Sequence, residues 1–229
     1  MTDFLVAIDG PAGSGKSSVS KAVARKLDFA YLDTGAAYRA LTWAIQHGHI
    51  SAENITAAGL NENFEYSIST DPDNYWVRVG NENVTDAIRS SEVAEGVSEF
   101  AKQPEVRSFM KTLTREIAAQ SQNRGIVVEG RDITTVVAPD SQIKILLTAS
   151  EEVRLKRRSA ELSAQEAIKV RRQVSERDQN DSKVVDFMTP AEGVILVDST
   201  ELNFEQTVAA VREIIERGLA AAQKGTSND

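Results

Sequence analysis

Five short runs along the chain are apolar at almost every position, and helical patterns separate them. These runs are residues 4–8, 29–32, 126–128, 143–147 and 194–197. A run that is apolar throughout, rather than at alternate positions, is typical of a parallel strand covered on both faces. After the first run, Val19, Val23 and Leu27 recur at four-residue spacing and form one apolar helical stripe. The pattern predicts an α/β fold with a parallel sheet flanked by helices.

Segment 64–86 follows a different pattern, because apolar and polar residues alternate with a period of two. Turn-forming residues at 71–74 and 80–81 interrupt the alternation, which indicates a small antiparallel meander. We therefore predict an insert at 60–95 on a core formed by 1–59 and 96–229. The last stretch, AAAQKGTSND at 220–229, predicts a disordered tail.

Composition narrows the class of protein. The 229 residues are 41% hydrophobic and 26% charged, as in ordinary globular proteins, and they include no cysteine, which excludes disulfides and thiolate metal sites. The net charge of −8 argues against general affinity for the nucleic-acid backbone. No apolar run reaches membrane-spanning length, and the first residues lack the basic region of a signal peptide. We expect a cytoplasmic protein with neither a membrane nor a nucleic acid as partner.

The stretch GPAGSGKS, which begins at Gly10, matches the phosphate-loop pattern G-x-x-x-x-G-K-[ST] at every fixed position. It lies between a predicted strand and a predicted helix, where backbone N–H groups and the helix N-terminus can surround a phosphate. Lys16 would bridge the β- and γ-phosphates, and the Ser17 hydroxyl would be a magnesium ligand. The predicted ATP site comprises Gly10, Pro11, Ala12, Gly13, Ser14, Gly15, Lys16, Ser17 and Ser18.

The loop alone does not choose between a switch, a motor and a kinase. A GTPase needs the guanine-reading pattern N-K-x-D, and the chain contains no Asn-Lys dipeptide. An ABC-type ATPase needs L-S-G-G-Q, which is also absent. A small kinase needs a second anion site that faces the γ-phosphate.

Three stretches suit such a second site: LDTGAAYRA, VVEGRDITT and SERDQNDSK. Each places an arginine beside a carboxylate, and the first two follow predicted strands, where open α/β sheets bind ligands. Segment 151–178 adds eight Lys or Arg against six Asp or Glu, a local charge of +2 in an acidic protein. Each feature alone is typical of surface ion pairs or helix caps. Together with the phosphate loop they favour a site for an anionic acceptor.

Taken in order, the motifs IDGPAGSGKSS, LDTGAAYRA, QPEVRSFM, EGRDITTVVAPD, RLKRR and RDQNDS resemble those of the bacterial cytidylate kinases over residues 4–215. The resemblance implies a P-loop nucleoside monophosphate kinase with a five-stranded parallel sheet, an NMP-binding insert and a helical lid at about 150–178. It further implies a monomer that transfers the γ-phosphoryl group of ATP to CMP or dCMP with Mg²⁺. Two alternatives stay open: an ATP-binding regulator whose Tyr75-Trp76 pair contacts a partner, and a kinase for another small acceptor.

The resemblance also implies roles for individual residues. It implies that the acceptor phosphate is bound by Arg39, Arg131 and Arg177, and that the lid arginines are Arg154, Arg157 and Arg158. The implied base contacts are Ser98, Arg107 and Asp132, Asp181 would contact the ribose, and Thr34 and Tyr38 would complete the acceptor site. Glu129 would orient magnesium-bound water beside Ser17. A carboxylate can accept from the cytosine 4-amino group while a guanidinium donates to O2 and N3. Uracil would mismatch both groups.

The chain departs from the family pattern at three positions. Glu129 stands where aspartate is usual, and Thr134 stands where glycine is common. Val184 replaces a further phosphate-binding arginine, which Lys183 could replace only as a point charge without the paired donors.

Overall fold

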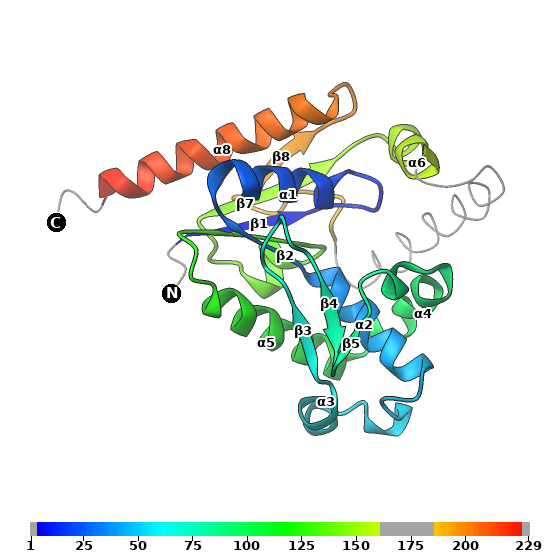
Figure 1. The fold of residues 1–229 in the computed structure, drawn as a ribbon. Coiled ribbons are helices and arrows are strands. Elements are labelled where there is room, and N and C mark those ends of the chain that lie inside the picture. The colour runs from blue at the N-terminus through cyan, green and yellow to red at the C-terminus, as the bar shows by residue number, and fades with distance from the viewer. Residues whose placement is uncertain (1–3, 161–185, 226–229) are drawn as a thin grey trace.

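The computed structural model describes residues 4–160 and 186–225, and a five-stranded parallel sheet forms its centre (Figure 1). The strands are β1 (Leu5–Asp9), β2 (Ala30–Asp33), β6 (Ile126–Gly130), β7 (Ile143–Thr148) and β8 (Ile195–Asp198). Their order across the sheet is β2-β6-β1-β7-β8, and every neighbouring pair is parallel. The predicted parallel sheet is therefore confirmed, with each strand on one of the five apolar runs.

Helices cover both faces of the sheet. On one face lie α1 (Lys16–Leu27) and α8 (Phe204–Gly225), and the predicted stripe on α1 is buried there. On the other face, α5 (Pro104–Gln120) and the short helix η3 (Ile133–Val137) pack against β1, β2 and β6. Within the described residues no helix has both the length and the apolar character of a membrane span.

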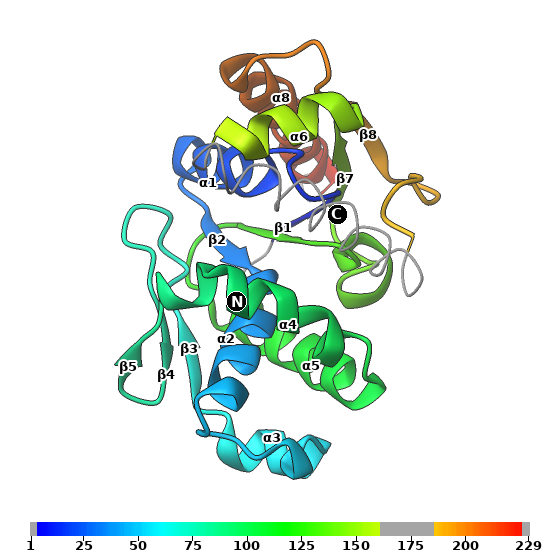
Figure 2. The ribbon, with the colours of Figure 1, turned by 90° about the vertical axis from the view of Figure 1, so that its right-hand side faces the viewer.

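The segments around the meander form a second packed group (Figure 2). It contains helices α2 (Thr34–Gln46), α3 (Ala57–Asn63) and α4 (Ser91–Ala101), short helices η1 (Ala52–Asn54) and η2 (Ala87–Arg89), and strands β3 (Tyr66–Ile68), β4 (Val77–Val79) and β5 (Glu82–Asn83). The three strands form an antiparallel sheet, as predicted. Its core includes Leu41 of α2 and Met110 of α5, so the meander shares apolar contacts with helices outside it. The limits predicted for the insert, 60 and 95, fall inside α3 and α4.

The loop between β3 and β4 contacts the edge of the main sheet. The Tyr31 N–H donates to the carbonyl of Thr70 at 2.8 Å, which extends hydrogen bonding beyond edge strand β2. The Lys21 ammonium lies 3.8 Å from the ring centroid of Tyr75, and that ring also packs against Tyr31. Tyr75 is thus a half-buried internal contact, which weakens the alternative in which it forms a partner surface.

The C-terminal part differs from its prediction at one point. Helix α8 continues through Gly225, so Ala220–Gly225 are helical rather than a disordered tail. Helix α6 (Glu151–Ala160) is the described part of the predicted lid, and it lies beside the start of α1 (Figures 1 and 2). Residues 161–185 and 226–229 lie outside the described residues.

Candidate active site

The phosphate loop connects β1 to α1 at the carboxyl edge of the sheet. Gly13 has φ of 76°, and a β-carbon there would lie 2.7 Å from the carbonyl oxygen of Arg154. Gly15 has φ of 86° and immediately precedes the first turn of α1. Since residues with a β-carbon rarely adopt this conformation, the two glycines allow the loop to curl over the helix N-terminus. The loop thereby has the geometry that phosphate binding requires.

Glu129 joins the phosphate loop to its neighbouring strands. It lies on β6, between β1 and β2, and is 2% exposed. Its Oε1 accepts hydrogen bonds from the Ser17 hydroxyl at 2.5 Å and from the Tyr31 hydroxyl at 2.9 Å. The Lys16 ammonium lies 3.9 Å from Oε2. Burial, with the negative charge of Asp33, raises the pKa of Glu129.

Asp33 and Arg39 form a buried ion pair where β2 ends and α2 begins. Asp33 Oδ1 accepts from the N–H of Ala36 and caps α2, while Oδ2 accepts from Arg39 Nη2 at 2.7 Å. Burial alone would raise the pKa of Asp33, but the charges of Arg39 and Lys16 outweigh it and hold the pKa below its ordinary value. Among the described residues Arg39 Nε is buried without a hydrogen-bond partner. This donor has the chemistry to meet an anionic oxygen.

Arg107 and Asp132 form a second ion pair, between α5 and the loop after β6. Arg107 Nη2 lies 2.6 Å from Asp132 Oδ2, and about a quarter of the Arg107 side chain is exposed. Burial raises the pKa of Asp132, although the charge of Arg107 opposes the shift. Two of the three residues expected to read the base, Arg107 and Asp132, therefore meet in the structure, 25 positions apart in sequence.

Asp9 links the strand before the phosphate loop to the segment after β6. Asp9, the last residue of β1, is 3% exposed, and its carboxylate accepts from the N–H groups of Ile133 and Thr134 at 2.9 and 2.8 Å. The Thr134 hydroxyl donates to it as well, at 2.6 Å. Burial raises the pKa of Asp9, against these hydrogen bonds. The threonine found where glycine is common thus adds a hydroxyl donor to a buried carboxylate.

The two described lid arginines lie against the phosphate loop. Arg154 Nη1 donates to the carbonyl of Ala12 at 2.9 Å. Arg157 donates to the carbonyl of Ser14 at 3.3 Å and to the carbonyl of Ser199 at 2.8 Å. These hydrogen bonds hold α6 against the phosphate loop. A contact of either arginine with the transferring phosphoryl group stays a prediction. The side chain of Arg158 is not described, and Arg177 and Asp181 lie outside the described residues.

The other expected acceptor residues lie on the second packed group. The Thr34 hydroxyl donates to the carbonyl of Glu129 at 2.8 Å, so it fastens α2 to β6. Tyr38 is half-buried on α2 and packs against the core of that group, and Ser98 is half-buried on α4. A phosphate or base contact for these residues stays a prediction.

Three further polar residues of this edge were not among the predicted site residues: Asp9, Tyr31 and Asp33. Asp33 did have a sequence signal, because aspartate is a preferred N-cap residue that accepts a hydrogen bond from the backbone N–H three residues later, here that of Ala36. Asp9 and Tyr31 carried none, because their partners, Thr134 and Glu129, lie 125 and 98 residues away in sequence.

A loop of this sequence and curvature, between a buried parallel strand and a helix, defines the class of P-loop nucleotide-binding proteins. A family model described as cytidylate kinase matches residues 6–217. The cytidylate kinase of Streptomyces avermitilis is 42% identical over 219 residues, which cover 95% of this chain and 94% of that protein. The cytidylate kinase of Exiguobacterium sibiricum is 39% identical and covered over its full length, with 96% of this chain. The chain belongs to the cytidylate kinase family.

Proposed function

We propose that the protein transfers the γ-phosphoryl group of ATP to CMP or dCMP, giving ADP and CDP or dCDP. The observation that carries this proposal is the arrangement of two anion sites at one edge of the sheet. The phosphate loop follows β1, while the Asp33–Arg39 pair follows β2 and Asp132 follows β6. Glu129 contacts both sides through Ser17 and Thr34. A donor and an acceptor nucleotide can therefore face each other over β6.

The chemistry requires positioning rather than a general base. The acceptor is a phosphate that is already anionic at neutral pH, so the main barrier is the approach of two polyanions. Lys16 would stabilise the transferring phosphoryl group, and Arg39 and Arg131 would hold the acceptor phosphate with Arg177. Arginine suits this task because its planar, permanently charged group binds two phosphate oxygens at once.

The donor residues fit a magnesium ion. In the part of the chain that the structure describes, no group of three or more His, Cys, Asp or Glu side chains could hold a metal ion, so an ion here would need the phosphates of ATP. The Ser17 hydroxyl and the Glu129 carboxylate are hard oxygen donors whose oxygens lie 2.5 Å apart. Ser17 would hold the ion directly and Glu129 through water. When bound, Mg²⁺ neutralises part of the triphosphate charge.

Base selection would rest on the Arg107–Asp132 pair, and the resemblance adds Ser98 on α4. CMP would bind both members of this pair, because its 4-amino group donates to the Asp132 carboxylate while O2 and N3 accept from the Arg107 guanidinium. UMP would turn a carbonyl toward Asp132 and an N–H toward Arg107, and each mismatch in a closed site costs about 1–3 kcal/mol. With UMP, the Arg107–Asp132 ion pair would therefore remain formed, and neither side chain would bind the base.

A coupled assay of ADP release tests the function, with CMP, dCMP, UMP, AMP and GMP as acceptors. The proposal expects strong turnover with CMP and dCMP and little with the other three. Equal turnover with UMP would refute the base contacts of Arg107 and Asp132. ATP binding without turnover on any nucleotide would support the regulator alternative.

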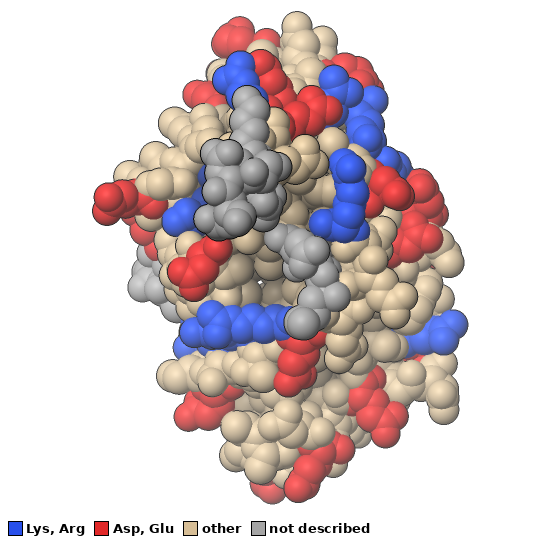
Figure 3. Space-filling model, turned by 90° about the vertical axis from the view of Figure 1, so that its left-hand side faces the viewer, with Lys and Arg blue, Asp and Glu red and all other residues tan. Residues whose placement is uncertain are grey.

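We also propose that the enzyme acts as a cytoplasmic monomer whose partners are nucleotides. One chain supplies both anion sites, so no second copy is needed to complete them. On the face drawn in Figure 3, basic and acidic side chains are interspersed rather than gathered in one field. Light scattering after size exclusion would check the monomer, for which a mass near twice that of the chain is the contradicting result.

A further inference from the structure

We propose that Phe187 is a positioning residue: its ring holds the guanidinium of Arg131 in the orientation that meets the acceptor phosphate. This inference rests on the proposed function, because it takes Arg131 to be a phosphate ligand. Phe187 belongs to none of the motifs that pointed to the site, and it lies in the loop that leads to β8.

The contact between Arg131 and Phe187 is close, and its aromatic partner is buried. The central carbon of the Arg131 guanidinium lies 4.5 Å from the centroid of the Phe187 ring. Phe187 is 1% exposed, whereas Arg131 is half-buried at the carboxyl end of β6. A cation over an aromatic face is attracted by the ring, more strongly when water is excluded. The buried Phe187 ring therefore forms a fixed surface against which the Arg131 guanidinium packs.

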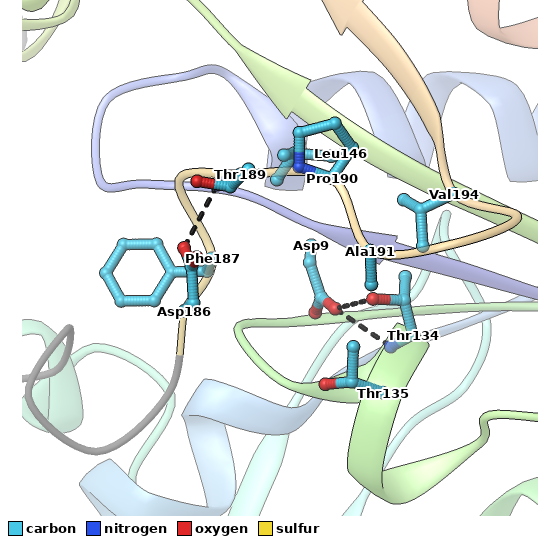
Figure 4. A pocket seen from close by; sticks show the side chains of 10 residues that line it. All are labelled: Asp9, Thr134, Thr135, Leu146, Asp186, Phe187, Thr189, Pro190, Ala191 and Val194. Carbon is cyan, nitrogen blue, oxygen red and sulfur yellow. Dashed lines mark hydrogen bonds between the residues drawn. The ribbon is translucent and has the colours of Figure 1, made fainter.

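The loop that carries Phe187 is itself held in place. The Asp186 carboxylate accepts from the N–H groups of Met188 and Thr189 at 2.9 and 3.0 Å, which forms a tight turn around Phe187. Figure 4 shows this loop opposite Asp9 and the Thr134 segment, with a cavity between them. The cavity measures about 10 Å³, room for about one water molecule. The loop thus faces the segment that follows Arg131 across this small cavity.

Both ends of the Arg131 side chain are then constrained. Its backbone is held by Asp9, which binds the N–H groups of Ile133 and Thr134 just downstream. Its guanidinium lies over the face of the Phe187 ring, and an arginine held on an aromatic face still has N–H donors able to bind oxygens. A long side chain that is ordered before the ligand arrives loses less conformational freedom on binding. Phe187 should therefore strengthen acceptor binding without touching the acceptor.

The test compares Phe187→Leu with Phe187→Tyr in steady-state kinetics. Phe187→Leu keeps an apolar side chain but removes the aromatic face, and we expect KM for CMP to rise about fivefold. KM for ATP should change less than about twofold, because Phe187 lies against Arg131, which we assign to the acceptor phosphate. Phe187→Tyr keeps the face and should restore KM for CMP. The matched control is Phe204→Leu, the same change at a side chain 48% exposed.

A double-mutant cycle with Arg131→Ala separates the inference from the function on which it rests. If Phe187 acts through Arg131, Phe187→Leu should have little further effect on KM for CMP in the Arg131→Ala background. The inference is overturned if Arg131→Ala raises KM for CMP while Phe187→Leu does not, or if Phe187→Leu has the same effect in both backgrounds. An equal rise of KM for both nucleotides would overturn it too, since it indicates a general structural role. Arg131→Ala with an unchanged KM for CMP would refute the phosphate contact of Arg131 itself.

Discussion

The donor and acceptor sides of the site are built in opposite ways. The donor side is one contiguous loop, and its shape comes from backbone geometry at Gly13 and Gly15. The acceptor side, as we propose it, is assembled from side chains on α2, α5 and the loop after β6. A contiguous loop can be recognised from its sequence motif, whereas a site assembled from several segments depends on how residues distant in sequence pack together.

The acceptor side as proposed also contains two close ion pairs. Arg39 and Arg107 lie 2.7 and 2.6 Å from carboxylate oxygens of Asp33 and Asp132. Such pairing compensates the cost of burying the two arginines. An acceptor nucleotide bound as proposed would have to share or displace these carboxylates, so we expect the acceptor side to be the more sensitive to small changes in geometry.

The largest effect should come from Lys16→Ala. Removing the ammonium leaves the transferring phosphoryl group without one stabilising charge, so kcat should fall about 10²–10³-fold. Lys26→Ala on the exposed face of the same helix is the control and should leave kcat unchanged. ADP release under saturating nucleotides measures both. Normal turnover in Lys16→Ala would remove the phosphate loop from the mechanism.

Arg39→Lys should have the next largest effect. Lysine keeps the charge but loses the paired donors, so we expect KM for CMP to rise about 10- to 100-fold while KM for ATP stays similar. The control is Arg25→Lys, because Arg25 also binds an aspartate, Asp73, at 2.6 Å but on the exposed edge of α1. A rise of both KM values in Arg39→Lys would contradict the separation of the two sides.

Asp132 should make base selection dependent on pH. Because burial raises its pKa, the carboxylate gains its proton, and loses its acceptor capacity, at a pH above the ordinary value of about 3.9. The ratio of kcat/KM for CMP over UMP should therefore fall as the pH is lowered toward that raised pKa. Comparing two nucleotides cancels the titration of their common phosphate. Asp132→Asn should lower the ratio about tenfold at pH 7 and weaken its dependence on pH, leaving the part that comes from protonation of the cytosine ring at N3. An Asn variant whose ratio changes with pH as much as that of the wild type would assign the effect to a group other than Asp132.

The smallest effect on turnover should come from Thr134, at the junction of the two sides. Thr134→Ala removes the hydroxyl that donates to buried Asp9, which should lower the free energy of unfolding by about 1.5 kcal/mol. Thr134→Ser keeps the hydroxyl and serves as the control. Chemical denaturation measures both, and equal stability of the two variants would show that the hydroxyl contributes nothing.

The sequence predicted the local features well and the long-range ones only through resemblance. Five apolar runs became five strands, and the glycine pattern became the phosphate loop, because both depend on neighbours in the chain. The Arg107–Asp132 pair had no local signal. The contacts of Glu129 with Tyr31 and of Phe187 with Arg131 depend on strand order and loop packing, which no local pattern specifies. The carbonyl contacts of Arg154 and Arg157 follow from the packing of α6 on the loop.

The separation of a donor side from an acceptor side is tested most directly by calorimetric titration of CMP into Lys16→Ala. We expect a dissociation constant for CMP within about threefold of the wild-type value, even though turnover is nearly lost. In the reciprocal titration, Arg39→Lys should bind ATP normally. Loss of CMP binding in Lys16→Ala, in proportion to the loss of turnover, would contradict the account.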